Sequence, residues 1–382
     1  RNSLDYLMGF NISPVLWQRL RGAAKSAGRV QSPALRLVVD REIEIEKFQT
    51  EEYWTISADF KDENNNVMQA NLTLLNDEKV EKFTFKDADK TNITANELEQ
   101  KEYHVTSVTS QKRNRNPYAP FTTSTLQQSA STNLKISPRD TMSTAQKLYE
   151  AGLITYMRTD GIEMAPEGIT SARKQISNFL GEHYLPEKPR VFKNKAKNAQ
   201  EAHECIRPTD FSKTPKNTKN LNKSELDLYA LIWKRALASQ ARAAEVLQTT
   251  VFISSFCNSA EFRLSGQVVT FEGHLKIFQD QKKEDDEKRI PDIREKSKMK
   301  LEQINKEQHF TEPPPRFNEA SLIKRLEEEG IGRPSTYASI ISKIQERNYV
   351  KKEKNRLVPE DTGRLLNFFL EAYFNKYIEY NY

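Results

Sequence analysis

The sequence predicts an α+β protein of several domains, in which two helical, winged-helix-like domains are joined by a split β domain with two arms. Three observations predict this architecture. A chain of 382 residues is longer than one hydrophobic core usually serves. The spacing of apolar residues changes from helical to strand-like and back twice along the chain. Two helical segments also repeat each other's pattern.

The composition excludes several classes of protein. Lys and Arg number 59 against 53 Asp and Glu, a net charge of +6 that fits a polyanionic partner only weakly. The sequence contains no run of about 20 apolar residues, so it predicts no membrane-spanning helix. Two cysteines, Cys205 and Cys257, are too few for a disulfide scaffold or a cysteine-based zinc site. We expect a cytoplasmic protein.

The chain begins with a helical pattern, assigned to residues 1–48. Apolar residues follow helical spacing from Leu4 to Leu20, with a break expected at Pro14. A second helix is predicted over about 33–48. Residues 313–382 are helical again apart from one hairpin. We expect the two ends to form one helical domain together.

Strand-like patterns predict a β domain from residues 49–115 and 244–312. Apolar residues alternate over 53–60, which indicates a half-buried strand. Further strands are predicted at 67–75, 103–109, 249–256, 260–264 and 267–271. The charged run 281–289 is expected to be a solvated loop. The helical stretch 116–243 is thus an insertion, and the long connections to it suggest an arm.

The internal repeat has a fixed offset, since Phe121 corresponds to Phe317, 196 residues later. Each copy predicts helix, turn and helix, with a proline near the start of the second helix. That helix ends at Gly152 or Asn348, residue types that tolerate a left-handed cap. A short strand at 153–157 or 349–352 follows, and the later copy adds a hairpin. This is the winged-helix plan, whose second helix often lies on DNA. The alternative is two generic helical units with a structural role.

Tyr156 is the candidate nucleophile. It follows the second helix of the first copy, and Arg158 is expected on the same face of a strand. A tyrosine hydroxyl can attack phosphorus and form a phosphotyrosine ester, but it needs a cation to stabilise the developing charge. A guanidinium at Arg158 supplies that charge and clamps phosphate. The alternative is a tyrosine that packs on its neighbours beside a solvated arginine.

Several motifs together resemble the type IA DNA topoisomerases of bacteria, in the topoisomerase I branch. Their segments, in the order of that family, are DYLMGF at 5–10, SPVLW at 13–17, SAGRVQS at 26–32, ITYMRTDG at 154–161, AHECIRPT at 202–209 and GIGRPSTY at 330–337. The resemblance covers the whole chain. It implies a toroid with a two-arm β arch and two winged-helix domains.

The resemblance also implies residue roles. Tyr156 would form a 5′-phosphotyrosine link to one DNA strand, Arg158 would position the scissile phosphate, and His203 would lie near the active site. The residues implied to contact DNA are Ser26, Ala27, Gly28, Arg29, Val30, Gln31, Asn2, Ser3, Tyr6, Asn11, Arg333 and Arg347. The implied partners are single-stranded DNA and negatively supercoiled duplex DNA at the nucleoid. We expect a monomer.

The sequence departs from the family pattern at several positions. Arg1 and Asn2 stand where two arginines are usual, Cys205 replaces an alanine, and Gly161 stands where serine is common. The acidic triplet that holds Mg²⁺ in the family is not in the sequence. We therefore expect a fragment, cut at both ends, that binds no metal itself, with the Mg²⁺ site in a missing N-terminal domain.

The resulting hypothesis is an ATP-independent topoisomerase I. It would cut one strand, pass the other, reseal the break and relax negative supercoils, while the fragment alone would be inactive. Three alternatives remain: a non-catalytic winged-helix DNA-binding protein, a decatenase of the topoisomerase III branch, and a structural scaffold. The segments 202–209 and Met157 are more typical of topoisomerase I.

Overall fold

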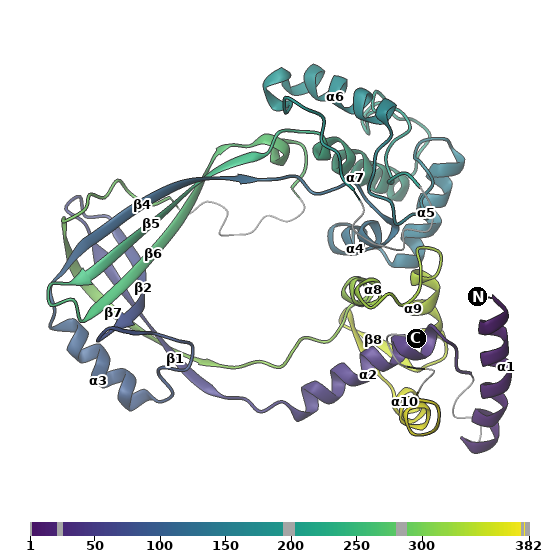
Figure 1. Cartoon of the computed structure of the whole chain (residues 1–382), viewed down its shortest axis with the longest axis horizontal. Helices are drawn as coiled ribbons and strands as arrows, with labels where there is room; N and C mark the ends of the chain where they lie inside the picture. Colours follow the sequence, from purple (N-terminus) through teal and green to yellow (C-terminus); the bar gives the residue numbers. More distant parts are fainter. Residues whose placement is uncertain (1, 21–25, 194–202, 280–288, 376–377, 379–382) are drawn as a thin grey trace.

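The chain forms a ring around a central opening, with a β domain on one side and two helical units on the other (Figure 1). This computed structural model describes residues 2–20, 26–193, 203–279, 289–375 and 378, and the backbone alone for residues 2–9. None of the described helices is long and apolar enough to span a membrane.

The terminal helical unit combines both ends of the chain. Its elements are α1 (Asn2–Arg19), α2 (Gln31–Lys47), α8 (Glu319–Glu328), α9 (Tyr337–Glu346), β8 (Val350–Glu353), β9 (Arg356–Pro359) and α10 (Asp361–Phe374). Leu35 of α2 packs in one apolar core with Leu322 and Ile344. The expected break at Pro14 was wrong, because α1 runs through that residue. An interior proline removes one N–H donor and crowds the preceding turn, but Ile12 and Leu16 on either side of it are buried in the core of this unit, and that packing keeps the chain helical.

The inserted helical unit lies at the tip of the arm. Its elements are α4 (Thr123–Asn133), α5 (Pro138–Glu150), α6 (Pro166–Leu180), η1 (Glu182–Tyr184) and α7 (Lys223–Ser239). A core that includes Leu126, Leu148 and Ile232 holds them together.

The two helical units repeat each other down to their caps. Thr122 starts α4 in a capping box with Thr125, and Asn318 starts α8 in the equivalent box with Ser321. The predicted left-handed caps are confirmed, since φ is +68° at Gly152 and +57° at Asn348. The hairpin of the later copy is confirmed as β8 and β9.

The β domain is a seven-stranded antiparallel sheet in the order β1-β7-β4-β5-β6-β2-β3, and β1 also pairs with β2, which closes it. Its elements are β1 (Glu52–Lys61), β2 (Val67–Leu75), β3 (Glu78–Lys79), α3 (Ala88–Glu99), β4 (Tyr103–Arg115), β5 (Ala244–Ser255), β6 (Ala260–Phe271), η2 (Gly273–Lys276) and β7 (Lys298–Phe310). The sequence patterns predicted neither α3 nor the strands β3 and β7, and they divided β6 into two strands. Residues 280–288 of the predicted charged loop lie outside the described residues.

Two strand pairs position the helical units. β4 and β5 pair from Tyr103 with Ser255 to Arg115 with Ala244, and this ribbon carries the inserted unit. β1 and β7 lead to α2 and α8 of the terminal unit. Three separate apolar cores, one for each unit, support the domain boundaries given above, which we keep as a proposal.

Candidate active site and nucleic-acid interface

The segment that carries Tyr156 is held by the segment 203–209 rather than by a strand. The expected strand at 153–157 is reduced to one bridge between Ile154 and Pro208. Beside it, the Thr155 N–H donates to the Arg207 carbonyl at 2.9 Å, and the Arg207 N–H donates to Thr155 Oγ1 at 3.0 Å. The Thr155 hydroxyl also donates to the Cys205 carbonyl at 2.7 Å. Two motifs about 50 residues apart in sequence thereby become one surface.

Tyr156 and Arg158 both face outward. The Tyr156 side chain is 43% exposed, and Arg158 is exposed, while Met157 and Thr159 between and after them are buried. This alternation gives the shared face that the sequence predicted, without a regular strand. The phenol is therefore accessible to a phosphate, with a cation two residues away.

Two rings surround the phenol. The ring of Tyr149, at the end of α5, lies edge-on to Tyr156 at 5.3 Å between centroids. The imidazole of His203 lies edge-on at 6.4 Å. The structure thus brings His203 to Tyr156, as the resemblance implied. Sequence reasoning missed Tyr149, and its only signal was an aromatic residue just before the Gly152 cap.

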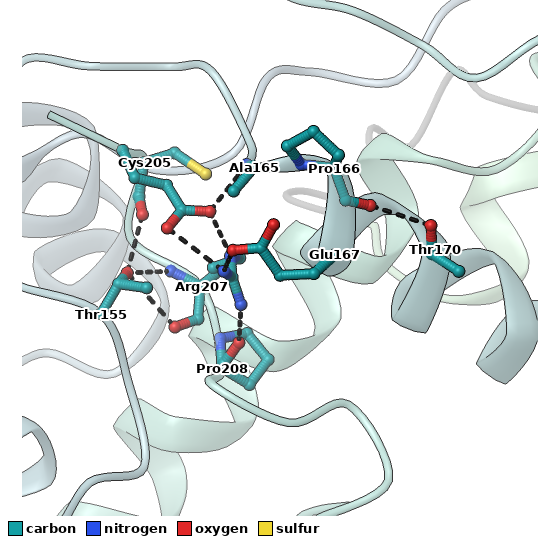
Figure 2. Close-up of polar contacts among 9 residues, drawn as sticks. Thr155, Ala165, Pro166, Glu167, Thr170, Cys205, Arg207 and Pro208 are labelled. Atoms are coloured by element: carbon teal, nitrogen blue, oxygen red, sulfur yellow. Dashed lines mark hydrogen bonds and ion pairs between the residues drawn. The ribbon is translucent and has the colours of Figure 1, made fainter. Parts of the chain in front are cut away.

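A buried arginine, Arg207, links the segment 203–209 to α6 (Figure 2). The Arg207 guanidinium is buried and forms an ion pair with Glu204. It also donates to the Pro208 carbonyl at 2.9 Å and lies 3.7 Å from Glu167 of α6. Glu204 Oε1 accepts the Ala165 N–H at 2.7 Å, so the pair joins the segment to α6. This pair was not among the predicted site residues, although opposite charges three residues apart are a recognisable signal in the sequence.

The backbone at residue 161 leaves no room for a side chain. A Cβ at this residue would lie 1.9 Å from the carbonyl oxygen of His203. The departure from the serine common in the family therefore accompanies a close backbone approach between the two motifs. This approach helps to place His203 beside Tyr156.

Arg158 opens onto a groove of about 450 Å³ between α5 and α9, the second helices of the two copies. Its lining combines the cations Arg139, Arg158 and Lys343 with four hydroxyls, those of Ser143, Ser335, Ser339 and Ser342. Arg139 also forms an exposed ion pair with Glu346 at 3.1 Å, which joins the two helices. Hydroxyls and cations together are typical of contacts to a phosphate backbone.

The residues implied to contact DNA at 26–31 pack against the end of α9. Arg347 donates to Gln31 Oε1 at 3.2 Å, and the Tyr349 hydroxyl bonds both the N–H and the carbonyl of Ser26 at 3.0 Å. Ala27 and Gln31 are buried, whereas Gly28, Arg29 and Val30 are half-buried. The structure therefore brings this segment and Arg347 into one cluster.

The other implied DNA contacts are more scattered. The Arg333 side chain is exposed and donates to the carbonyls of Gly330 and Gly332 at 3.2 and 2.7 Å. Asn11 is exposed on α1. Asn2, Ser3 and Tyr6 belong to α1, but their side chains lie outside the described part. Arg1 lies outside it entirely.

The two helical units meet at α4 and α8. The Ser124 hydroxyl donates to Glu327 Oε2 at 2.7 Å across this contact. Burial raises the pKa of Glu327, and the nearby carboxylates of Glu328 and Asp160 raise it further. Asp160 follows Tyr156 by four residues, so the active-site segment also faces the contact between the units.

Within the described residues, no group of three or more His, Cys, Asp or Glu side chains could hold a metal ion. Glu204, the carboxylate nearest in sequence to His203, is already paired with Arg207. The described residues therefore do not provide a Mg²⁺ site.

Comparison with known proteins agrees with this geometry. The DNA topoisomerase family matches residues 1–382. DNA topoisomerase 1 of Rickettsia felis is 46% identical over 100% of this chain and 51% of its own length. That of Xylella fastidiosa (strain 9a5c) is 44% identical over 100% of the chain and 49% of its length. Full-length topoisomerase I from Thermotoga maritima superposes with a TM-score of 0.84 at 34% identity, over 100% of this chain and 61% of that one.

Two winged-helix-like units on a two-arm β domain define the toroidal core of a type IA topoisomerase. The chain belongs to the DNA topoisomerase family, and its curated relatives are topoisomerase I enzymes. It spans about half the length of the curated relatives cited above.

Proposed function

We propose that the protein to which this chain belongs is a type IA topoisomerase I that relaxes negatively supercoiled DNA. The observation that carries the proposal is the exposed Tyr156 phenol, which lies beside His203 and two residues from Arg158. Arg158 itself lines a groove of cations and hydroxyls. A non-catalytic DNA-binding module would have no need of an accessible phenol at this point.

In the proposed reaction, the Tyr156 oxygen attacks the phosphorus of one strand. The P–O3′ bond breaks, the 3′-hydroxyl leaves with a proton, and the 5′-phosphate stays on the tyrosine as an ester. Attack of the 3′-hydroxyl on the same phosphorus reverses the step and releases the phenol. Because the ester conserves the phosphodiester energy, resealing needs no ATP.

Each neighbouring residue has a proposed part in this step. Arg158 holds the scissile phosphate and stabilises the negative charge that develops on its oxygens. His203 is within reach of the same phosphate. Tyr149 fixes the orientation of the phenol through its edge-on ring. The segment 26–31, with Arg333 and Arg347, holds the single strand that leads to Tyr156.

The Mg²⁺ implied by the resemblance finds no ligand set among the described residues, so we assign it no step. When bound, it would supply positive charge near the leaving 3′-hydroxyl. We propose that its ligands belong to another part of the whole protein. We also propose that the protein is a cytoplasmic monomer associated with the nucleoid, and that this chain alone binds single strands and relaxes nothing. Relaxation of supercoiled plasmid by this chain with Mg²⁺ would refute the last proposal.

The test uses a single-stranded oligonucleotide with sulfur in place of the bridging 3′-oxygen, because a thiolate leaves without a general acid. We expect a covalent adduct that peptide mass spectrometry maps to Tyr156. Tyr156→Phe should abolish the adduct and keep DNA binding. Tyr149→Phe is the matched control, since it removes a neighbouring hydroxyl and keeps the ring. An adduct on another side chain, or one that persists in Tyr156→Phe, contradicts the proposal.

A further inference from the structure

Two threonine hydroxyls hold the backbone around Tyr156 and Arg158. One belongs to Thr155, directly before Tyr156, and the other to Thr123, the first residue of α4. Each hydroxyl donates to one backbone carbonyl and accepts one backbone N–H. Because a hydroxyl is both a donor and an acceptor, each threonine fixes two backbone groups at once.

The Thr155 side chain joins its own segment to the segment 203–209 (Figure 2). Its Oγ1 donates to the Cys205 carbonyl at 2.7 Å and accepts the Arg207 N–H at 3.0 Å. The Thr155 backbone N–H also donates to the Arg207 carbonyl at 2.9 Å. Tyr156 follows Thr155 directly, and His203 precedes Cys205 by two residues. The hydroxyl therefore fixes the chain segment that carries the phenol relative to the segment that carries the imidazole.

The Thr123 side chain holds the backbone on both sides of Arg158. Its Oγ1 donates to the Met157 carbonyl at 2.7 Å and accepts the Thr159 N–H at 2.8 Å. The Thr123 backbone N–H donates to the Thr159 carbonyl at 2.9 Å. Thr123 is completely buried, so no solvent competes for these bonds. They tie the residue that carries the guanidinium to the start of α4.

The side chains of Tyr156 and Arg158 are both exposed, whereas Met157 between them is buried in the core of the inserted unit. An exposed side chain is constrained mainly by the backbone that carries it, so the backbone determines where the phenol and the guanidinium lie. A displacement of about 1 Å in a reacting group can lower an enzymatic rate about 100-fold. The two hydroxyls thus act where the proposed reaction is most sensitive to position.

We propose that Thr155 and Thr123 are positioning residues for strand cleavage, an inference that rests on the proposed function. Thr155 holds the Tyr156 phenol beside His203. Thr123 holds the Arg158 guanidinium at the phosphate that the phenol attacks. Neither threonine is a catalytic residue, because each donates its hydroxyl proton to a backbone carbonyl. The alternative is that both hydroxyls only stabilise the fold.

The experiment measures single-turnover adduct formation by this chain on the oligonucleotide with sulfur in place of the bridging 3′-oxygen. Valine has nearly the shape of threonine without the hydroxyl, and serine keeps the hydroxyl. Thr155→Val should lower the rate at saturating oligonucleotide by about tenfold or more and leave the half-saturating concentration unchanged. Thr123→Val should lower the rate and also raise the half-saturating concentration, because Arg158 binds the phosphate. Thr155→Ser and Thr123→Ser should restore the parent values.

Thr141→Val is the matched control for stability. Thr141 is also completely buried in the inserted unit, but its hydroxyl donates only to the Ser137 carbonyl at the start of its own helix, at 2.8 Å. This variant should unfold at a lower urea concentration than the parent and form the adduct at the parent rate. A general loss of stability is thereby separated from a loss of positioning.

A second readout needs no reaction. In chain with labelled tyrosine and histidine, we expect a nuclear Overhauser effect between the rings of Tyr156 and His203, assigned by its disappearance in Tyr156→Phe. It should be lost in Thr155→Val and present in Thr155→Ser. Its persistence in Thr155→Val, an unchanged adduct rate in either valine variant, or an equal loss of rate with serine would overturn the proposal. An absence of adduct in the parent chain would contradict the proposed function alone, since the ring contact is measured without DNA.

Discussion

The hydroxyl of Ser124 donates to the carboxylate of Glu327 at 2.7 Å, and this bond joins α4 of the inserted unit to α8 of the terminal unit. The two residues lie 203 positions apart in sequence. Ser124 lies beside the Thr122 capping box at the start of α4, whereas Glu327 lies in the last turn of α8. This bond is therefore a direct polar link between the two helical units.

Glu327→Gln should stabilise the protein at neutral pH. Burial raises the pKa of Glu327 above its ordinary value of 4.5, so the carboxyl favours folding below pH 4.5 and loses that contribution as pH rises through the folded pKa. The amide can still accept the Ser124 hydroxyl, and it removes the negative charge that the carboxylates of Glu328 and Asp160 repel. We expect a higher melting temperature than wild type at pH 7–8 and no difference at pH 4. Glu328→Gln is the control, because this neighbouring carboxylate makes no bond to Ser124 in the described chain. An equal gain at both pH values would contradict this account.

Gly161→Ala should destabilise the inserted unit by about 1–3 kcal/mol, the usual range for overpacking. The reason is the His203 carbonyl oxygen, 1.9 Å from the new Cβ. Fluorescence of Trp233, buried in that unit, reports its unfolding in urea once the other two tryptophans, Trp17 and Trp54, are replaced by Phe. Gly28→Ala is the control for stability, because its Cβ would meet nothing closer than 3.7 Å. Stability unchanged by Gly161→Ala would show that the two segments separate easily.

Arg207→Ala should lower the free energy of unfolding by about 3 kcal/mol or more, because it leaves Glu204 without its buried partner. It should also loosen the segment that positions Tyr156 and lower adduct yield. Glu167→Ala removes the other carboxylate, which is 76% exposed and 3.7 Å away, and should cost less than about 1 kcal/mol. The Trp233 signal measures both. Equal losses of unfolding free energy in the two variants would mean that the ion pair with Glu204 does not stabilise the fold more than the contact with Glu167.

The two cysteines should differ in reactivity. Hydrogen bonds with Ser255 and Ser259 lower the pKa of the exposed Cys257 to about 6, and burial raises the pKa of Cys205 to about 12. Iodoacetamide at pH 7 should therefore modify Cys257 alone, at a rate that reaches half its maximum near pH 6. Ser259→Ala should move that midpoint upward. Mass spectrometry of the alkylated peptides gives both rates, and modification of native Cys205 would contradict the burial.

Local sequence patterns predicted a structural feature correctly where the residues of that segment are themselves the physical cause of the feature. The caps at Gly152 and Asn348 were predicted because few residue types adopt a positive φ at low cost. The strand at 67–75 was predicted to the residue, since its alternate side chains are buried in the sheet. Failures occurred where tertiary contacts override local preference. Pro14 lies inside a helix, and the residues before Tyr156 form a bridge in place of a strand.

The sequence by itself determined the architecture, the repeat and the motifs that carry the family resemblance, because periodicity and turn chemistry are local properties of the chain. Only the tertiary structure decided which groups meet. It set Tyr149 and His203 around Tyr156, placed Arg207 behind it and joined Ser124 to Glu327. These contacts link residues far apart in sequence, and their distances depend on how the units pack, which no spacing in the sequence specifies.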